Sequence, residues 1–309
     1  MPQNDRSHIA ELAHLYVDGA FDRRELLRRV AFVTGSIAAA TMALESVGLP
    51  APAAVHERDT CPADVRVPED AEDLEVLHQV QFPGDAGPLF AHQARPRHAE
   101  PLPGILVIHE NRGLNDHIRD VTRRAARAGF VAVGIDLLSR FGGTPDDPEA
   151  ALRLYQQTTV DGRLADLLSA VDYLQSLDDV QGHTVGAVGF CAGGGNCWTL
   201  ALNTSALAAA VPFYGAPVPP VDGLDALGAP VLAIYAELDR TLTRSVLPVI
   251  TRLEDLQKPF GFHIYEGTNH AFHNDTGANY HRLAACDAWG KTVAFFQKHL
   301  PCPRLRHWG

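Results

Sequence analysis

A cysteine stands between glycines at the point where an apolar segment gives way to a new element. Residues Gly189-Phe190-Cys191-Ala192-Gly193-Gly194 directly follow the apolar run Thr184 to Val188. Where a strand turns sharply into a helix, the corner residue adopts strained backbone geometry, and only glycine fits beside it. The corner side chain is then held open at a helix N-terminus, where the dipole and free N–H groups lower a thiol pKa and stabilise a nearby oxyanion. The pattern predicts a nucleophilic cysteine for acyl transfer.

An acid and a histidine follow this cysteine in the chain order that such a nucleophile needs. Asp239 lies in the loop after Pro230 to Tyr235, which is predicted to be a buried parallel strand. His270 lies in the loop after Phe260 to Tyr265, the next predicted strand. Glu237 competes with Asp239 for the role of the acid, and each of these residues could also be an ordinary solvated loop residue. The agreement of three independent placements favours a catalytic triad.

Alternating segment types predict the elements that position these residues. An antiparallel hairpin of Val76 to Phe82 and Leu89 to Ala94 is expected at the edge of a sheet. Strands and helices then alternate, which predicts an α/β fold with a mainly parallel sheet covered by helices on both faces. The site is expected at the carboxyl ends of the strands. The predicted strands are 104–108, 131–135, 184–188, 208–213, 230–235 and 260–265, and the predicted helices are 117–128, one or more across 148–177, 192–202, 243–256 and 277–299.

Composition narrows the class of protein. The chain has 309 residues, of which 46% are hydrophobic, and this suffices for one α/β domain with an N-terminal extension. Its net charge is −11, which argues against nucleic acid as a partner because phosphate binding needs a basic face.

The remaining cysteines and histidines give no sign of a metal site or a disulfide framework. The five cysteines have no paired spacing, and the histidines lack a helical His-x-x-x-His pair with a nearby acid. We therefore predict no metal. The other cysteines are interpreted as structural or incidental, and their pairing state stays open. The residues considered were Cys61, Cys197, Cys286, Cys302, His263, His270, His273 and His281.

The N-terminal region has two interpretations. The run Asp22-Arg23-Arg24-Glu25-Leu26-Leu27-Arg28-Arg29, the weakly apolar Val30 to Leu44 and Ala51-Pro52-Ala53 resemble a twin-arginine export signal, which favours a periplasmic location. The apolar segment is too short to span a bilayer. The flanking acids and an amphipathic stretch at 8–20 support the alternative, a retained helical hairpin in a cytoplasmic protein. The predicted division is an extension or signal at 1–56, a linker at 57–73, the α/β domain at 74–300 and a tail at 301–309.

From Leu74 to Leu300 the chain resembles the dienelactone hydrolase (carboxymethylenebutenolidase) family of α/β hydrolases. The resemblance implies that Cys191 is the nucleophile, that His270 is its base and that Asp239 orients His270. It implies an enzyme without metal or organic cofactor that hydrolyses a lactone or small ester through a thioester acyl-enzyme. The matching segments are Val107-Ile108-His109-Glu110-Asn111-Arg112-Gly113-Leu114-Asn115, Val133-Gly134-Ile135-Asp136-Leu137-Leu138, the cysteine elbow and the two loops with the acid and the histidine.

The resemblance also implies a second carboxylate and an oxyanion hole. Glu110 corresponds to the carboxylate that engages the resting cysteine and helps to form the thiolate as substrate binds. Such help is needed because a thiol of ordinary pKa is only a few per cent ionised at neutral pH. The alternative is a structural carboxylate paired with Arg112. The backbone N–H groups of Ala192 and Asn111 are expected to form the oxyanion hole.

One position departs from the family pattern and bears on the substrate. Family members hold a substrate carboxylate partly with an arginine four residues after the catalytic histidine, where this chain has Asn274. Arg112, Arg140 and Arg153 remain as candidate substrate-binding cations. We therefore expect a small-molecule lactone or ester as the partner, with no preference for a carboxylate-bearing one. A non-catalytic or redox-responsive small-molecule-binding protein on the same scaffold is the alternative, and the oligomeric state stays open.

Overall fold

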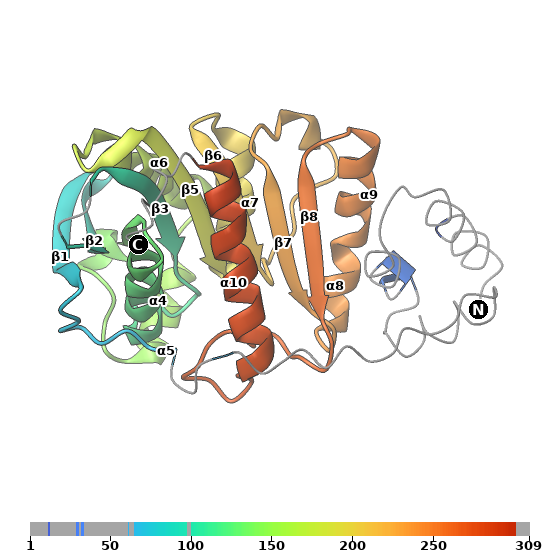
Figure 1. Cartoon of the computed structure of the whole chain (residues 1–309), viewed down its shortest axis with the longest axis horizontal. Coiled ribbons are helices and arrows are strands. Elements are labelled where there is room, and N and C mark those ends of the chain that lie inside the picture. Colours follow the sequence, from blue (N-terminus) through green and yellow to red (C-terminus); the bar gives the residue numbers. More distant parts are fainter. Residues whose placement is uncertain are drawn as a thin grey trace, which may run out of the picture.

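One mainly parallel sheet runs through the molecule. The computed structural model describes residues 12, 29, 30, 32, 33, 61, 65–97 and 100–300. Within these residues the strands are β1 (Leu74–Gly84), β2 (Gly87–Pro96), β3 (Leu102–Ile108), β4 (Val131–Asp136), β5 (Val180–Phe190), β6 (Leu207–Phe213), β7 (Val231–Ala236) and β8 (Phe260–Tyr265). They form an eight-stranded sheet in the order β1-β2-β4-β3-β5-β6-β7-β8 (Figure 1). The pairs β1–β2 and β2–β4 are antiparallel, and the other neighbours are parallel.

Helices cover both faces of this sheet. The helices are α4 (Asp116–Arg127), α5 (Pro148–Tyr155), α6 (Val160–Ser176), α7 (Ala192–Asn203), α8 (Arg240–Ser245), α9 (Leu247–Asp255) and α10 (Arg282–His299). One hydrophobic core joins the sheet to α6, α7 and α9, and a second joins it to α4 and α10, which lie on the near face in Figure 1. The predicted α/β-hydrolase architecture is therefore confirmed.

Alternation along the buried strands decides which core each side chain enters. On β3, Leu106 and Ile108 belong to the core under α6 and α7, whereas Ile105 and Val107 belong to the core under α4 and α10. Successive strand side chains point to opposite faces. A continuous apolar run is thus the pattern of a strand that is buried on both faces.

Two helix boundaries differ from the prediction. The single helix expected at 243–256 is divided into α8 and α9, and Pro248 lies in the first turn of α9. Proline has no N–H to donate, so it fits the first turn of a new helix but not a helix interior. The final helix begins at Arg282 rather than near Gly277, with His281 as its N-cap. The residues before it form turns against the loop that carries His270, since Asn279 Nδ2 donates to the His270 carbonyl at 2.9 Å.

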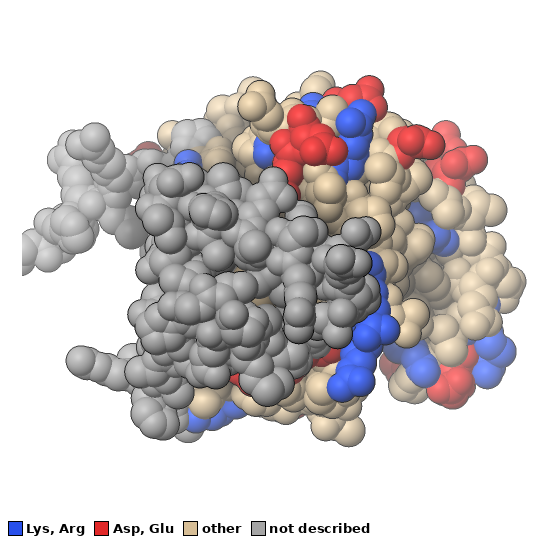
Figure 2. Space-filling model, turned by 90° about the vertical axis from the view of Figure 1, so that its right-hand side faces the viewer, with Lys and Arg blue, Asp and Glu red and all other residues tan. Residues whose placement is uncertain are grey.

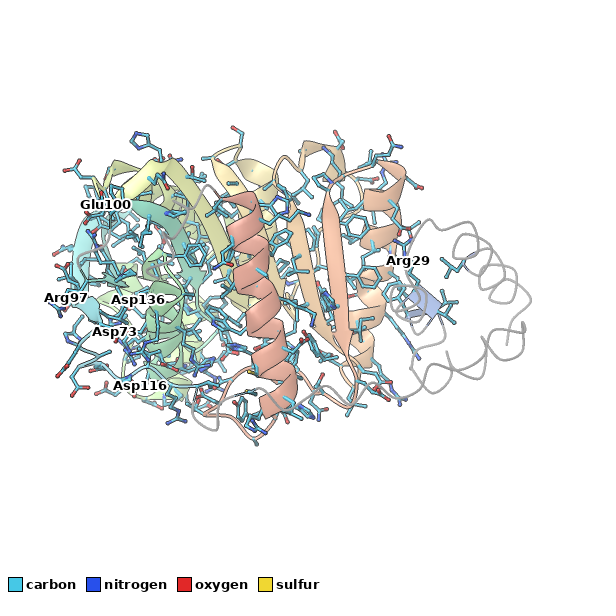
Figure 3. All side chains as sticks on the ribbon, in the orientation of Figure 1. Arg29, Asp73, Arg97, Glu100, Asp116 and Asp136 are labelled. Carbon is cyan, nitrogen blue, oxygen red and sulfur yellow. The ribbon has the colours of Figure 1, made fainter. Side chains whose placement is uncertain are left out.

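The chain just before β1 packs on α4. Val67 is 3% exposed, its N–H donates to Asp120 Oδ1 at 2.7 Å, and its carbonyl accepts from Arg123 Nε at 2.7 Å. The Asp73 carboxylate pairs with Arg127, and the Asp73 backbone carbonyl accepts the N–H of Arg97. Figure 3 labels Asp73 and Arg97 at the edge of the sheet formed by β1. The predicted division into extension, linker, domain and tail stays a prediction. Nearly all of the predicted export signal lies outside the described residues.

The described surface carries charges of both signs. On the side shown in Figure 2, acidic and basic side chains are interspersed over the described part. Of the helices that the structure describes, none has the length and apolar character needed to cross a membrane.

Candidate active site

The parallel register brings five loop residues to one edge of the sheet. Ile108 of β3 is level with Gly189 of β5, Phe190 of β5 with Phe213 of β6, and Ala236 of β7 with Tyr265 of β8. The loops that follow these paired residues therefore start from the same edge of the sheet, at the carboxyl ends of the parallel strands, where ligands bind in open α/β sheets. They carry Glu110, Cys191, Tyr214, Asp239 and His270.

Cys191 occupies the strained corner between β5 and α7. Its φ and ψ are 54° and −118°, which a residue with a side chain rarely adopts. Glycine is required on both sides of it because the backbones touch. A Cβ on Gly189 would lie 2.0 Å from the Gly193 carbonyl oxygen, and a Cβ on Gly193 would lie 2.4 Å from the His109 carbonyl oxygen. The predicted elbow is present, and it packs directly against the end of β3.

Backbone hydrogen bonds hold this corner on the neighbouring strand. The Cys191 N–H donates to the Phe213 carbonyl at 3.1 Å, and the Cys191 carbonyl accepts from the N–H groups of Gly195 and Ala216, both at 3.1 Å. The position of the thiol is therefore set by backbone contacts.

Asp239, and not Glu237, is the acid beside the histidine. His270 Nδ1 lies 2.6 Å from Asp239 Oδ2, and the side chains are 34% and 20% exposed. Glu237 instead accepts the N–H of Gly267 at 2.9 Å and so closes the turn before the histidine. The structure thus places Asp239, rather than Glu237, in contact with His270.

Glu110 is a buried carboxylate that lacks a cationic partner among the described residues. It is 7% exposed, its Oε2 accepts from Asn274 Nδ2 at 3.0 Å, and its Oε1 has no hydrogen-bond partner within the described part. The alternative pairing with Arg112 is wrong, since Arg112 Nη1 binds Glu149 Oε1 at 2.6 Å. In the structure, Asn274 rather than Arg112 contacts the Glu110 carboxylate.

His109 fixes the backbone at Glu110. Its Nε2 accepts the Leu137 N–H at 3.0 Å, so the proton of the neutral ring is on Nδ1, which donates to the Glu110 carbonyl oxygen. Burial lowers the pKa of His109, and the nearby charge of Asp136 only partly opposes this effect. The ring therefore stays neutral and serves as a support.

The surroundings of Cys191 favour the protonated thiol. Burial, followed by the negative charges of Glu110 and Asp239, raises the pKa of Cys191 to about 12. The Ala192 N–H at the start of α7 does lower this pKa, as the sequence predicts, but its effect is smaller. Desolvation and a neighbouring carboxylate both penalise a thiolate. A thiolate at Cys191 is therefore disfavoured in these surroundings.

Tyr214 is a member of the site that sequence reasoning missed. It has a positive φ of 36°, its ring centroid lies 4.9 Å from that of His270, and it is fully buried. The hydroxyl lies near the His273 amide yet makes no well-formed hydrogen bond within the described part. Burial, then the charges of Glu110 and Cys191, raises its pKa well above the usual value. Its place directly after the predicted strand 208–213 was the available signal.

A second tyrosine, Tyr155 of α5, contacts the helix that follows the elbow. Tyr155 OH accepts from Asn196 Nδ2 at 3.1 Å, and the Arg163 guanidinium lies 5.0 Å from the centre of its ring. Burial raises its pKa, and Cys191 is among the charges that act on it. Nothing in the local sequence distinguishes Tyr155 from an ordinary helix residue.

The remaining predicted residues have varied surroundings. Ala192 begins α7 and Asn111 follows Glu110 in the turn after β3, and their role as oxyanion donors stays a prediction. Arg140 binds Asp166 Oδ2 at 2.6 Å, and Arg153 is 64% exposed and lies 3.5 Å from Asp147 Oδ2. With Arg112 on Glu149, all three candidate cations already have carboxylate partners.

Behind the site, a buried charge cluster supports the loop of His270 and Asn274. Asp275 is contacted by His117 Nδ1 at 2.8 Å, Arg124 at 2.9 Å and Arg66 at 2.8 Å. Burial acts to raise the pKa of Asp275, but these contacts outweigh it and hold the pKa well below the usual value. As for metals, no group of three or more His, Cys, Asp or Glu residues in the described chain is arranged to hold an ion.

These features define the class of protein as an α/β hydrolase with a cysteine at the strand–helix elbow and an Asp–His pair. Residues 89–300 match the dienelactone hydrolase family, and the chain belongs to this family. The prediction of an enzyme that hydrolyses lactones or carboxylic esters is thereby confirmed, and the binding-protein alternative loses support.

Individual relatives agree with this assignment. A Synechocystis protein named "Putative carboxymethylenebutenolidase" is 32% identical over 242 residues, which are 72% of this chain and 96% of the relative. A Bradyrhizobium protein named "Probable 2-oxo-3-(5-oxofuran-2-ylidene)propanoate lactonase" is 34% identical over 224 residues, 68% of this chain and 90% of the relative. A crystal structure of a "Putative Dienelactone Hydrolase" from Klebsiella pneumoniae has a TM-score of 0.63 at 29% identity and covers 72% of this chain and 98% of its own.

Proposed function

We propose that this enzyme hydrolyses lactones or small carboxylic esters with Cys191 as the nucleophile, through a thioester acyl-enzyme. The observation that supports this most is the thiol at the strained corner of β5 and α7, on the same sheet edge as the Asp239–His270 pair. A nucleophile, a base and a residue that orients the base are the parts that covalent acyl transfer needs.

The first half of the reaction opens the lactone or ester. The Cys191 proton moves to His270, either directly or by way of Oε1 of Glu110, and the thiolate attacks the acyl carbon. The N–H groups of Ala192 and Asn111 stabilise the oxyanion. Protonated His270 then gives its proton to the leaving oxygen, and a thioester remains on Cys191.

The second half releases the acid. His270 removes a proton from water, and the resulting hydroxide attacks the thioester carbon. The tetrahedral intermediate collapses, the carboxylic acid leaves and the thiol is restored. Asp239 keeps the imidazole in one orientation and stabilises its charged form in both halves.

The charges around the thiol favour neutral substrates. Glu110 is negative and buried, its partner Asn274 is neutral, and Arg112 and Arg140 are engaged in ion pairs. A substrate carboxylate gains strongly only from a cationic partner that is free to bind it. The anionic lactone in the name of the Bradyrhizobium relative is therefore expected to be no better a substrate than a neutral lactone of similar size. A clear preference for the anionic lactone would contradict this part of the proposal.

The test compares the wild-type enzyme with Cys191→Ala on p-nitrophenyl acetate and neutral lactones. Wild type should turn over, and a rapid quench in acid should trap one acetyl group on the tryptic peptide with Cys191, as seen by mass spectrometry. Cys191→Ala should lose about 10⁴-fold or more of kcat while its unfolding temperature is unchanged. Full activity in Cys191→Ala would overturn the covalent mechanism. Labelling of the thiol without turnover on any ester or lactone would favour the binding-protein alternative.

A further inference from the structure

The chain before β1 is attached to the last helix at a cysteine. Cys61 lies outside residues 89–300, which match the family, yet it contacts the first turn of α10. Arg282 Nη1 donates to the Cys61 carbonyl oxygen at 2.9 Å, and Cys61 Sγ lies 3.8 Å from the Arg282 carbonyl oxygen. Two contacts between residues 221 positions apart therefore hold Cys61 against this helix.

A second cysteine stands one helical turn further along α10. Residues four positions apart share a helix face, so Cys286 lies on the same side as Arg282 and faces Cys61. The two thiols are hydrogen-bonding neighbours, and this contact adds to burial in raising the pKa of Cys286 to about 12. Both side chains are partly exposed and can be reached by a reagent.

We propose that Cys61 and Cys286 are a disulfide-forming pair that joins the segment before the hydrolase domain covalently to the last helix. A disulfide needs two thiols that are already adjacent, and the Arg282 contacts bring this pair together without oxidation. The other described cysteines have different surroundings, since Cys191 is at the elbow and Cys197 is buried with its thiol on the Ala187 carbonyl. The sequence could not reveal the pair because its members are far apart in the chain.

The bond forms by exchange with a small disulfide such as oxidised glutathione. One cysteine thiolate attacks a glutathione sulfur and releases one glutathione thiolate, and the second cysteine thiolate attacks the mixed disulfide and releases the other. The two cysteine protons end on the two released glutathiones, so the oxidant is reduced as the protein is oxidised. Because the pKa of Cys286 is raised, the exchange is faster in alkaline than in neutral solution. Disulfides persist in oxidising compartments, which agrees with the export-signal interpretation of the N-terminal region rather than with the cytoplasmic alternative.

The experiment maps the bond in the full-length protein. Trypsin places Cys61, Cys286 and Cys302 in separate peptides, 59–66, 283–291 and 299–304. The protein is treated with oxidised glutathione in mildly alkaline buffer, quenched with N-ethylmaleimide, digested with trypsin in slightly acidic buffer and analysed by mass spectrometry. We expect peptides 59–66 and 283–291 to be linked and to separate on reduction. In denaturant, titratable thiols should fall by two from the five in the sequence.

Variants identify the partners. Cys61→Ser and Cys286→Ser should each abolish the linked species, whereas Cys302→Ser should leave it unchanged and serves as the matched control. The proposal is overturned if oxidised glutathione leaves only separate glutathione adducts on the two cysteines. It is equally overturned if Cys286 is found linked to peptide 299–304.

Discussion

Two carboxylates, Asp239 and Glu110, act on the Cys191 thiol, and they differ in what else their surroundings let them stabilise. Asp239 is partly exposed and lies 2.6 Å from a histidine nitrogen, so positive charge that develops on the ring meets a negative partner. Glu110 is buried, and the partner of its Oε2 is the neutral amide of Asn274. Its charge therefore acts on the thiol and raises the pKa of Cys191.

The comparison shows that the same chemical group can promote or suppress charge in one site. A carboxylate beside an imidazole favours the imidazolium that forms when a proton is transferred. A carboxylate beside a buried thiol disfavours the thiolate, because two negative charges would share a poorly solvated space. The surroundings of Cys191 thus favour the protonated thiol, and Glu110 lies close enough to act on it.

The largest loss of activity is expected from substitutions in the Asp239–His270 pair. His270→Ala should lower kcat on p-nitrophenyl acetate by ~10³–10⁴-fold, because it removes the group that transfers protons in both halves of the reaction. Asp239→Asn should lower kcat less, by about 10²-fold, since it removes only orientation and charge stabilisation. Glu237→Gln is the matched control and should be close to wild type. A crippled Glu237→Gln with a normal Asp239→Asn would show that the acid is Glu237.

Glu110→Gln, at the second carboxylate, should change the ionisation of the Cys191 thiol. Loss of the negative charge lowers the pKa of Cys191, so the rate of alkylation by iodoacetamide should rise at a pH about one unit lower than in wild type. At the same time kcat should fall by ~10–100-fold, because the neighbouring proton acceptor is gone. Glu149→Gln, which removes the surface partner of Arg112, should change neither property. An unaltered alkylation profile together with an unaltered kcat would leave Glu110 with a structural role only.

A positive charge introduced at Asn274 should give Glu110 a charged partner, so that the surroundings of Glu110 and Asp239 become more alike. In Asn274→Arg, the guanidinium would pair with Glu110, which Asn274 contacts in the native site, and would still offer donors to a substrate carboxylate. We expect kcat/KM for an anionic lactone to rise by about tenfold or less relative to a neutral one. Asn203→Arg, an exposed position at the end of α7, adds the same charge and should not change this ratio. An equal gain in both variants would mean that general electrostatic attraction is responsible.

The smallest loss of activity is expected from a substitution of Tyr214. Tyr214→Phe keeps the ring that contacts His270 and removes only the hydroxyl near Glu110 and Cys191. We expect kcat to fall about threefold to tenfold with no loss of thermal stability, because a buried hydroxyl without a well-formed hydrogen bond contributes little to folding. Tyr235→Phe is the control: it loses a hydroxyl that accepts from Trp198 Nε1 at 3.4 Å, so stability should fall slightly and activity should not. The reverse pattern would assign Tyr214 to packing alone.

The sequence by itself determined the architecture and the order of the chemistry. Apolar runs such as 184–188 and 230–235 identified buried strands, and the glycines around Cys191 identified the elbow, because both patterns follow from local sterics and burial. The sequence also placed Asp239 and His270 after the correct strands. It could not place helix boundaries such as the start of α10, where turns bound to a distant loop replace a predicted helical segment.

The tertiary structure decided which of the candidate residues meet and in which protonation state. Asp239 rather than Glu237 contacts His270, and Asn274 rather than Arg112 contacts Glu110. Tyr214 packs against His270 from the loop after β6, where the sequence carried no recognised motif. The pKa of Cys191 depends on burial and on charges from distant parts of the chain, which outweigh the lowering effect of the local helix N-terminus that the sequence predicts. Local patterns are set by neighbours in sequence, whereas electrostatics and partner choice are set by distances that only the folded chain defines.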